Sequence, residues 1–344
     1  MNKIRLYEIA TIIMGQSPKS SAYNNYGMGI PFMQGKTTFG RIYPYIDTWT
    51  TEWNKIAIPN DILFTVRAPV GDVNISNDTI AIGRGLAAIR SNKVNYKYLY
   101  YLLSTNKMIF SNASTGTIYE SINKDKIESA ELFIHDSSLQ QHIVDTIGSI
   151  DDLIEKYEEI VNKLNKLSNE LYLKSIANAS DLTTLKDYIS IETGSMNLED
   201  NNPDGKYDFY TRNEGIFKCD NYTHNTTGVI VAGEGNFKPK YASGKFGLHQ
   251  RAYLIKSLDA STINNETLFE IINSNQNFLN GVAVGSTVKS LRRNSFENMP
   301  FYKDGDYSLV ANKIHLIREE IIEIKEKINK LNNIKQLYLN KFFN

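Results

Sequence analysis

The sequence predicts a protein of the α+β class in which two similar mixed α/β domains are joined by two long helices that form an antiparallel coiled coil, a pseudo-two-fold internal repeat. Two stretches carry the same heptad pattern in the same phase, one from Ile143 and one from Val310. Each follows a segment of short apolar runs broken by Gly, Pro, Asn and Asp, a pattern typical of strands. With 344 residues, the chain also exceeds what one hydrophobic core usually serves.

Both heptad stretches space their apolar residues alternately by four and three. The first has Ile143, Ile147, Ile150, Ile154, Tyr157, Val161, Leu164 and Leu171, and the second has Val310, Ile314, Ile317, Ile321, Ile324, Ile328, Leu331 and Tyr338. Polar Ser168 and Lys335 occupy the one missing position in each. So narrow a stripe is buried only against another helix, so we expect the two helices to pair. Antiparallel pairing predicts a centre near Tyr157 and Ile324, with Ile143 near Tyr338.

The predicted boundaries follow from these stretches. We expect a first domain over residues 1–137, a long helix over 138–178, a second domain over 179–306 and a second long helix over 307–344. Ser138 and Ser308 are the predicted caps. The first helix, from Leu139 to Ile176, has a length of about 57 Å at 1.5 Å per residue.

The repeat extends into the two domains. Near their starts, Leu6, Glu8, Ile12 and Gly15 match Leu185, Asp187, Ile191 and Gly194. Near their ends, residues 114–117 with 121 and 122 match residues 283–286 with 290 and 291. Runs 61–66 and 229–231 predict strands, and 96–103 and 268–272 predict one helix in each domain. Between the matched ends the halves diverge, so one frame carries two different surfaces.

Composition restricts the function. Lys plus Arg equals Asp plus Glu at 38 each, so nucleic-acid binding needs a local patch. The single cysteine, Cys219, excludes a disulfide framework and favours a reduced, cytoplasmic location. Neither a signal sequence nor an apolar run long enough to span a membrane is apparent.

Catalytic motifs are missing. The sequence has no phosphate-binding loop and no Asn/Asp-Pro-Pro-aromatic motif of amino-methyltransferases, and its five histidines lack metal-ligand spacing. Two short Gly-x-Gly runs, at 83–85 and 233–235, and the Pro203-Asp204 pair are interpreted as turns. We therefore expect a protein that is not an enzyme and binds no metal or cofactor of its own.

Polar and basic residues do gather in Gly-rich loops beside aromatic residues. Such side chains neutralise phosphates and bond to base edges, although a solvated surface is the alternative for each one. The candidates are Gln34, Lys36, Thr37, Arg41, Arg67, Arg84, Thr115, Thr117 and Tyr119 in the first domain, and Tyr210, Arg212, Asn213, Lys238, Lys240, Lys245, His249, Gln250, Arg251, Ser286, Lys289 and Arg292 in the second.

In order along the chain, these features resemble the specificity subunit of type I restriction-modification systems. The resemblance is carried by Leu6-x-Glu8-Ile9 leading to Gly15 and Ser17-Pro18, Ile30-Pro31-Phe32, residues 60–63, the 98–103 helix, Gly116 ahead of Ser121, and the two long helices. The second half departs from it, with Ser195-Met196 after Gly194.

The resemblance implies a subunit that does no chemistry. Each domain would be a target recognition domain for half of a bipartite site in double-stranded DNA, and the helices would set the gap and dock methyltransferase subunits, two in number. Those subunits would supply S-adenosylmethionine, and restriction and translocase subunits would cleave.

Three alternatives stay open. The chain could be the specificity partner of a system with a fused modification-nuclease chain. It could be a nuclease or methyltransferase with unfamiliar motifs, or a coiled-coil adaptor that binds proteins or glycans.

Overall fold

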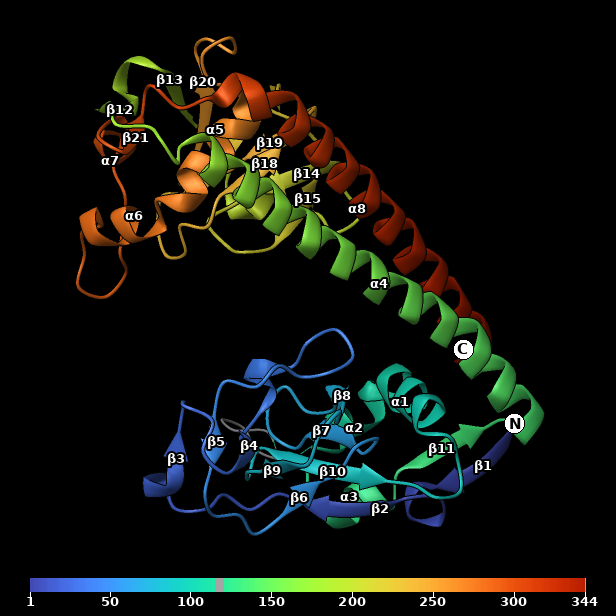
Figure 1. Cartoon of the computed structure of the whole chain (residues 1–344). Coiled ribbons are helices and arrows are strands. Elements are labelled where there is room, and N and C mark those ends of the chain that lie inside the picture. Colours follow the sequence, from blue (N-terminus) through green and yellow to red (C-terminus); the bar gives the residue numbers. More distant parts are fainter. Residues whose placement is uncertain (115–120, 344) are drawn as a thin grey trace. The chain divides into compact units, whose positions relative to one another are not determined.

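The computed structural model describes residues 1–114 and 121–343. The chain divides into two compact units (Figure 1). Unit 1 comprises Met1–Glu155 and Asn329–Asn344, and unit 2 comprises Lys156–Ile328. Because both boundaries fall inside the long helices, each long helix contributes one end to each unit.

The described residues of unit 1 form three sheets. Their orders are β1-β11, β2-β10-β7-β8 and β3-β5-β4-β9-β6. The strands are β1 (Asn2–Arg5), β2 (Thr11–Met14), β3 (Tyr23–Asn24), β4 (Ile30–Met33), β5 (Trp49–Thr50), β6 (Ile56–Ala57), β7 (Ile62–Thr65), β8 (Val73–Ile75), β9 (Ile80–Ile82), β10 (Leu86–Arg90) and β11 (Glu131–Ile134). All pairs are antiparallel except β4 with β9.

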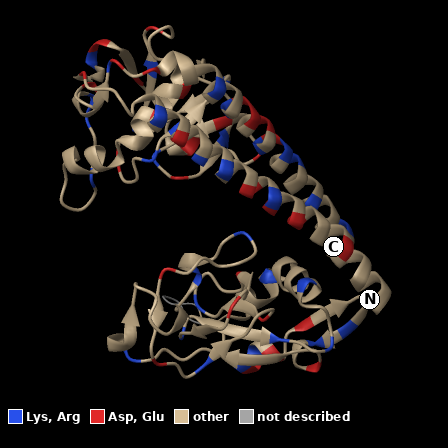
Figure 2. Cartoon of the chain, in the orientation of Figure 1, with Lys and Arg blue, Asp and Glu red and all other residues tan. Residues whose placement is uncertain are grey.

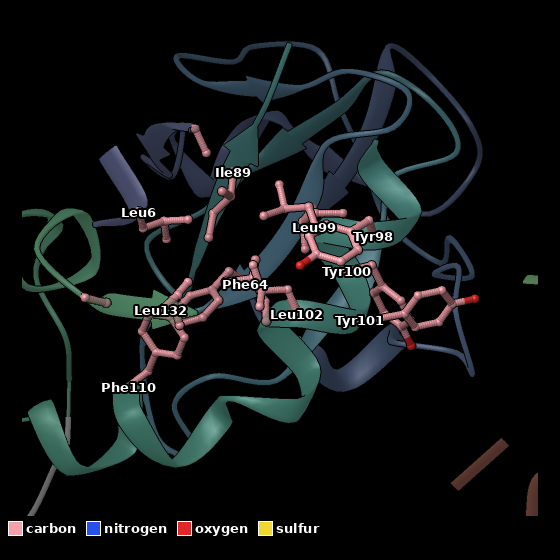
Figure 3. Packing of buried hydrophobic residues seen from close by; sticks show 14 of the residues in the cluster. Leu6, Phe64, Ile89, Tyr98, Leu99, Tyr100, Tyr101, Leu102, Phe110 and Leu132 are labelled. Atoms are coloured by element: carbon pink, nitrogen blue, oxygen red, sulfur yellow. The ribbon is translucent and has the colours of Figure 1, made fainter. Parts of the chain in front are cut away.

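The helices of unit 1 share one hydrophobic core with the four-stranded sheet. They are α1 (Tyr96–Thr105), α2 (Lys107–Ala113), α3 (Lys124–Glu128) and the first part of α4 (Ser137–Ser175), with short 3-10 turns η1 (Leu6–Glu8), η2 (Ser20–Ala22) and η3 (Lys36–Thr38). The predicted helix after Asn95 is confirmed, because the Asn95 side chain accepts a hydrogen bond from the Lys97 amide. Tyr98, Leu99 and Leu102 of α1 pack with Phe64, Ile89 and Leu132 of the sheets (Figure 3).

Unit 2 repeats this plan with different loops. Its sheets are β12-β21, β13-β20-β17-β18 and β15-β14-β19-β16. The strands are β12 (Leu182–Thr184), β13 (Ile189–Thr193), β14 (Tyr207–Tyr210), β15 (Ile216–Cys219), β16 (His224–Asn225), β17 (Gly228–Ala232), β18 (Lys240–Ala242), β19 (Lys245–Leu248), β20 (Ala252–Ser257) and β21 (Pro300–Tyr302). The helical elements are η4 (Leu185–Asp187), η5 (Leu198–Asp200), α5 (Asn265–Ser274), α6 (Gln276–Val282), α7 (Arg293–Glu297) and α8 (Tyr307–Phe343).

The matched ends of the repeat occupy equivalent places. Leu6 and Leu185 are fully buried at the first residues of η1 and η4. The Gly15 amide donates to the Leu86 carbonyl at 2.9 Å, and the Gly194 amide donates to the Ala252 carbonyl at 3.4 Å. Among the described strands, one parallel pair occurs in each half, β4 with β9 and β14 with β19. The predicted duplication of the frame is therefore confirmed at the level of hydrogen bonding.

The starts of the long helices differ from the prediction. Helix α4 begins at Ser137, one residue before the predicted cap Ser138, and Asp136 accepts a hydrogen bond from the Leu139 amide at 3.0 Å. Helix α8 begins at Tyr307, so Ser308 also lies inside its helix. Aspartate is as effective an N-cap as serine, so residue type alone does not indicate which of two nearby residues caps the helix. The predicted serine caps are wrong.

Within each unit, α4 and α8 contact one another along the predicted stripes. In unit 2, Tyr157 and Val161 share a cluster with Ile321 and Ile324. In unit 1, the buried Ile143 and Ile147 belong to the cluster against which Tyr338 packs. Low residue numbers on α4 thus meet high numbers on α8, so these contacts run antiparallel. The structure leaves none of the sixteen stripe residues exposed.

A buried polar group interrupts the apolar contacts of unit 1. The carboxylate of Asp151 accepts hydrogen bonds from the Tyr101 hydroxyl at 2.7 Å, from Lys335 Nζ at 2.8 Å and from Arg41 Nη1 at 2.6 Å. We call Arg41, Tyr101, Asp151 and Lys335 the unit 1 polar cluster. Since the Asp151 side chain is only 2 % exposed, these three donors hold its charge inside the protein.

Unit 2 has a polar cluster of its own. Glu270 on α5 accepts a hydrogen bond from the Ser168 hydroxyl at 2.5 Å and forms an ion pair with Arg318 on α8. Arg318 also donates to Asn165 Oδ1 at 2.8 Å, and its guanidinium carbon lies 4.0 Å from the centre of the Phe269 ring. We call Asn165, Ser168, Glu270 and Arg318 the unit 2 polar cluster. Both Glu270 and Arg318 are buried.

Candidate nucleic-acid interface

Four predicted residues of the first domain surround one pocket. Strands β4 and β7 end, and β10 begins, around a pocket of about 260 Å³. It is lined by Gln34, Gly35, Lys36, Thr37, Thr65, Arg67, Ala68 and Gly85. A side chain at Gly85 is excluded, because a Cβ there would lie 2.2 Å from the Gln34 carbonyl oxygen. The two loops can therefore come this close only with glycine at position 85. Their polar side chains then line the pocket.

The charges at this pocket are of two kinds. Lys36 Nζ lies 2.5 Å from Asp72, whose carboxylate also pairs with Lys107. Burial raises the pKa of Asp72, but the hydrogen bonds from Lys107 and Lys36 outweigh it, so the pKa is lowered overall. Arg67 and Arg84 are exposed, and no side chain of residues 1–114 or 121–343 pairs with either guanidinium. These two arginines are thus available to an anionic ligand.

Arg41 was predicted to contact DNA, but the structure gives it a different place. Its guanidinium donates to the Asp151 side chain and, at 3.1 Å, to the Asp151 carbonyl oxygen. It therefore belongs to the unit 1 polar cluster. The predicted residues Thr115, Thr117 and Tyr119 lie outside the described residues.

The second domain separates its predicted residues into buried and exposed sets. Tyr210 and His249 are buried, so neither side chain lies on an exposed surface. Burial raises the pKa of Tyr210 and lowers that of His249, which disfavours the charged form of each. Tyr210 is the last residue of β14, His249 directly follows β19, and these two strands form a parallel pair inside the domain. The residues that are exposed are Asn213, Lys238, Lys245, Gln250, Arg251, Ser286, Lys289 and Arg292.

Several of the basic side chains here already have partners. Lys240 donates to the carbonyl oxygens of Asn213 and Gly215, and burial lowers its pKa. Lys245 Nζ lies 4.7 Å from the centre of the Tyr222 ring. Arg212 and Arg251 both bind Glu234, a residue that the sequence did not single out. Four of the predicted basic side chains of this domain therefore already have a partner within it.

A second pocket was not anticipated from the sequence. It has a volume of about 520 Å³ and is lined by Ser17, Pro18, Lys19, Thr51, Glu52, Trp53 and Asn54. Trp53 is half exposed in it. A tryptophan within the polar run 51–54 was the available signal, since exposed indole rings are common at binding surfaces.

The long helices do not form a general basic surface. Figure 2 shows Lys and Arg interspersed with Asp and Glu along α4 and α8. Among the described residues, no group of three His, Cys, Asp or Glu side chains is placed to hold a metal ion. No described helix is long and apolar enough to cross a membrane.

Comparison with known proteins relates the first half of the chain to a known family. The model of the type I restriction modification DNA specificity domain matches residues 1–166. Residues 1–166 therefore carry a type I restriction modification DNA specificity domain. A similar relative is the type I restriction enzyme MjaX specificity subunit of Methanocaldococcus jannaschii, 43 % identical over 167 residues. The EcoDI specificity subunit of Escherichia coli is 24 % identical over 152 residues.

The matches to these relatives are partial. They cover 47 % and 44 % of this chain, and 39 % and 34 % of the relatives' own lengths. The fold is shared over a longer range with the crystal structure of the S subunit of a type I restriction-modification system from M. genitalium. That likeness covers 100 % of this chain and 96 % of the other, with a TM-score of 0.63 and 15 % sequence identity. It therefore extends the shared fold, and the fold alone, to the second half.

The pocket leads to a prediction about Arg67. Replacing Arg67 by Ala should weaken DNA binding by about 1–3 kcal/mol if its guanidinium contacts a base edge, and by less, whatever the sequence, if it contacts phosphate. Fluorescence anisotropy on the assembled complex at several salt concentrations measures both effects. Lys3→Ala removes the same charge from the separate β1-β11 sheet and should change neither. Full affinity in the Arg67 variant would exclude this pocket from the interface.

Proposed function

We propose that this chain is the DNA-recognition subunit of a type I restriction-modification complex, in which the domain of each unit recognises one half of a bipartite site in double-stranded DNA. The observation that carries the proposal is the duplicated frame with unlike surfaces. The hydrogen bonds of the frame recur in both domains, whereas the side chains at the strand ends differ. Recognition of two half-sites of different sequence requires two domains that share a frame but carry different surface side chains.

The long helices supply the second part of the proposal. They contain 39 and 37 residues, and each contributes one end to each unit. At 1.5 Å per residue, such a helix has a length of about 55–60 Å, which exceeds one DNA turn of about 34 Å. An antiparallel coiled coil of this length would act as a spacer that sets the gap between half-sites.

Catalysis is assigned to partner subunits. The chain carries none of the methyltransferase motifs sought in its sequence, so methyltransferase subunits would bring S-adenosylmethionine and modify the DNA. Restriction and translocase subunits would complete the assembly. Exposed apolar side chains on the unit 2 parts of both helices provide a docking surface, namely Ile160, Leu167, Leu309 and Leu316. A partner helix covers such a surface well, because apolar residues seven apart lie on one helix face.

The experiment replaces one domain. Exchanging residues 1–136 for the corresponding domain of a relative should change one half of the methylated motif and preserve the other half and the gap. Methylome sequencing of a strain that carries the hybrid gene measures the motif directly. The reciprocal exchange of residues 182–302 should change only the opposite half. If either exchange alters both halves, independent reading by the two domains is ruled out.

A further inference from the structure

Two arginines in the second domain are held by one carboxylate. Arg251 Nη1 lies 2.9 Å and 3.1 Å from the two Glu234 oxygens, and Arg212 Nη1 lies 3.1 Å from Oε2. Hydrogen bonds from Arg251, and then from Arg212, keep the pKa of Glu234 below its usual value, so the carboxylate is charged at neutral pH. Its side chain is 27 % exposed, and those of Arg212 and Arg251 are 40 % and 53 % exposed. The group therefore lies at the surface with a fixed internal geometry.

Each guanidinium retains most of its donors. Glu234 engages only the Nη1 nitrogen of either arginine, which leaves Nε and Nη2. Within the described part of the chain, no further hydrogen bond involves either guanidinium. A planar guanidinium with two donors on one edge matches a ligand with two adjacent acceptors. Because the carboxylate already orients both groups, less side-chain freedom is lost when such a ligand binds.

The first domain has an equivalent place in its own frame. The Val66 amide donates to the Gly85 carbonyl at 3.0 Å, just as the Gly233 amide donates to the Arg251 carbonyl at 2.8 Å. The bridge from Arg67 to Ser121 corresponds to the bridge from Glu234 to Ser290. Glu234 is thus the counterpart of Arg67, and Arg251 is the counterpart of Gly85.

Arg212, the third member of the group, also has a counterpart in the first domain. The Gly83 amide donates to the Met33 carbonyl at 2.8 Å, and the His249 amide donates to the Tyr210 carbonyl at 2.9 Å. Arg212, two residues after Tyr210, therefore corresponds to Gly35. Gly35, Arg67 and Gly85 all line the polar pocket of the first domain. One arginine with two glycines in the first domain is replaced by one carboxylate with two arginines in the second.

We infer that Arg212 and Arg251, oriented by Glu234, form the nucleotide-reading group of the second domain and bind a pair of adjacent acceptor atoms on one nucleotide. This inference rests on the proposed function. The N7 and O6 atoms of guanine provide such a pair in the major groove, and so do two oxygens of a backbone phosphate. Glu234 is a positioning residue, since both of its oxygens are occupied by the arginines.

The test uses the complex of the full chain with its methyltransferase partner, on a duplex that carries the motif found by methylome sequencing. Arg251→Lys retains the charge but loses the planar pair of donors. Glu234→Gln retains the shape but releases the arginines. Each protein is titrated on duplexes in which single guanines of the second half-site are replaced by 7-deazaguanine, which lacks the N7 acceptor. Thermal unfolding confirms that each variant is folded, and Arg212→Lys replaces Arg251→Lys if the latter is not.

If guanine is the ligand, the unaltered complex should lose about tenfold or more in affinity at one modified position. The two variants should bind the unmodified duplex more weakly by a similar factor, with no further loss on that modified duplex. If phosphate is the ligand, 7-deazaguanine should have no effect, and the slope of log K against log salt should fall by about one unit in Arg251→Ala, which removes the charge, but not in Arg251→Lys, which keeps it. The inference is overturned if Arg251→Lys and Glu234→Gln retain affinity and discrimination and Arg251→Ala retains the salt slope. The proposed function fails separately, if the unaltered complex binds its motif no better than a scrambled duplex.

Discussion

Replacing Arg318 by Ala should destabilise unit 2 by about 3–5 kcal/mol, because the change leaves a buried carboxylate without its counter-charge. Glu270 and Arg318 are 1 % and 5 % exposed at their side chains. After the change, the Ser168 hydroxyl would be the one remaining side-chain donor to Glu270 among the described residues. The lost contact of the guanidinium with the Phe269 ring adds to the effect.

Urea unfolding followed by two signals measures this effect. The chain has two tryptophans, Trp49 and Trp53, and both lie in unit 1. The circular dichroism transition should therefore shift more than the tryptophan fluorescence transition. Lys327→Ala is the matched control, since it breaks an exposed ion pair with Glu323 on the same helix and should leave both transitions unchanged. An unshifted transition in the Arg318 variant would mean that the ion pair contributes nothing to stability.

The pH dependence of the variant gives a second check. Burial raises the pKa of Glu270, and Arg318 counteracts this increase. Without Arg318, the folded-state pKa rises further above the unfolded value. A carboxyl group with a raised folded-state pKa is most stabilising when protonated, and this stability is lost as the pH rises through the folded-state pKa. The deficit of the variant should therefore be larger at pH 8 than at pH 5.

Replacing Ile321 by Asp should have an effect of similar size, at least about 3 kcal/mol. Ile321 is buried in the cluster with Val161 and Ile324, so the change removes apolar contacts and places a charge where no partner is available within that cluster. Helix pairing in unit 2 should weaken. Thermal unfolding and co-purification with the methyltransferase subunit should both show the loss.

Leu316→Asp separates folding from docking. Leu316 lies on the same helix but is 56 % exposed, so the substitution should change stability by less than about 0.5 kcal/mol. If the exposed apolar residues dock the methyltransferase, this variant should unfold normally yet recover much less of the partner. Normal recovery with Leu316→Asp would place the docking surface elsewhere.

The elements that follow from local patterns could be predicted from the sequence. The stripes beginning at Ile143 and Val310 depend only on spacing, and the helix after Asn95 depends on a local cap. Both polar clusters escaped prediction, because their members come from distant parts of the chain. Asp151, for example, receives Arg41 from a loop and Lys335 from the other helix. In the sequence, Ser168 and Lys335 were only interruptions of a stripe.

The candidate site was predictable in part, for a related reason. A basic residue in a Gly-rich loop looks the same whether it faces solvent, as Arg67 does, or an aspartate, as Arg41 does. Burial of Tyr210 and His249 depends on the parallel pairing of β14 with β19, which no local pattern indicates. In the sequence, Glu234 was interpreted only as part of the 233–235 turn. Its role is apparent only in the folded structure, where Arg212 and Arg251 both bind its carboxylate.

The two polar clusters give the duplicated halves different identities. Asp151 stands on α4 where Arg318 stands on α8, and Ser168 stands where Lys335 does, at the spacing of the heptad stripes. In a dimer made of two first halves, serine would replace the lysine that Asp151 requires. In a dimer made of two second halves, lysine would enter beside Arg318, so two cations would compete for Glu270. The polar groups at these positions find partners only when a first half pairs with a second half. The chain is therefore equivalent to a heterodimer of two unlike halves that are joined in a single polypeptide, and pairing of two like halves is disfavoured.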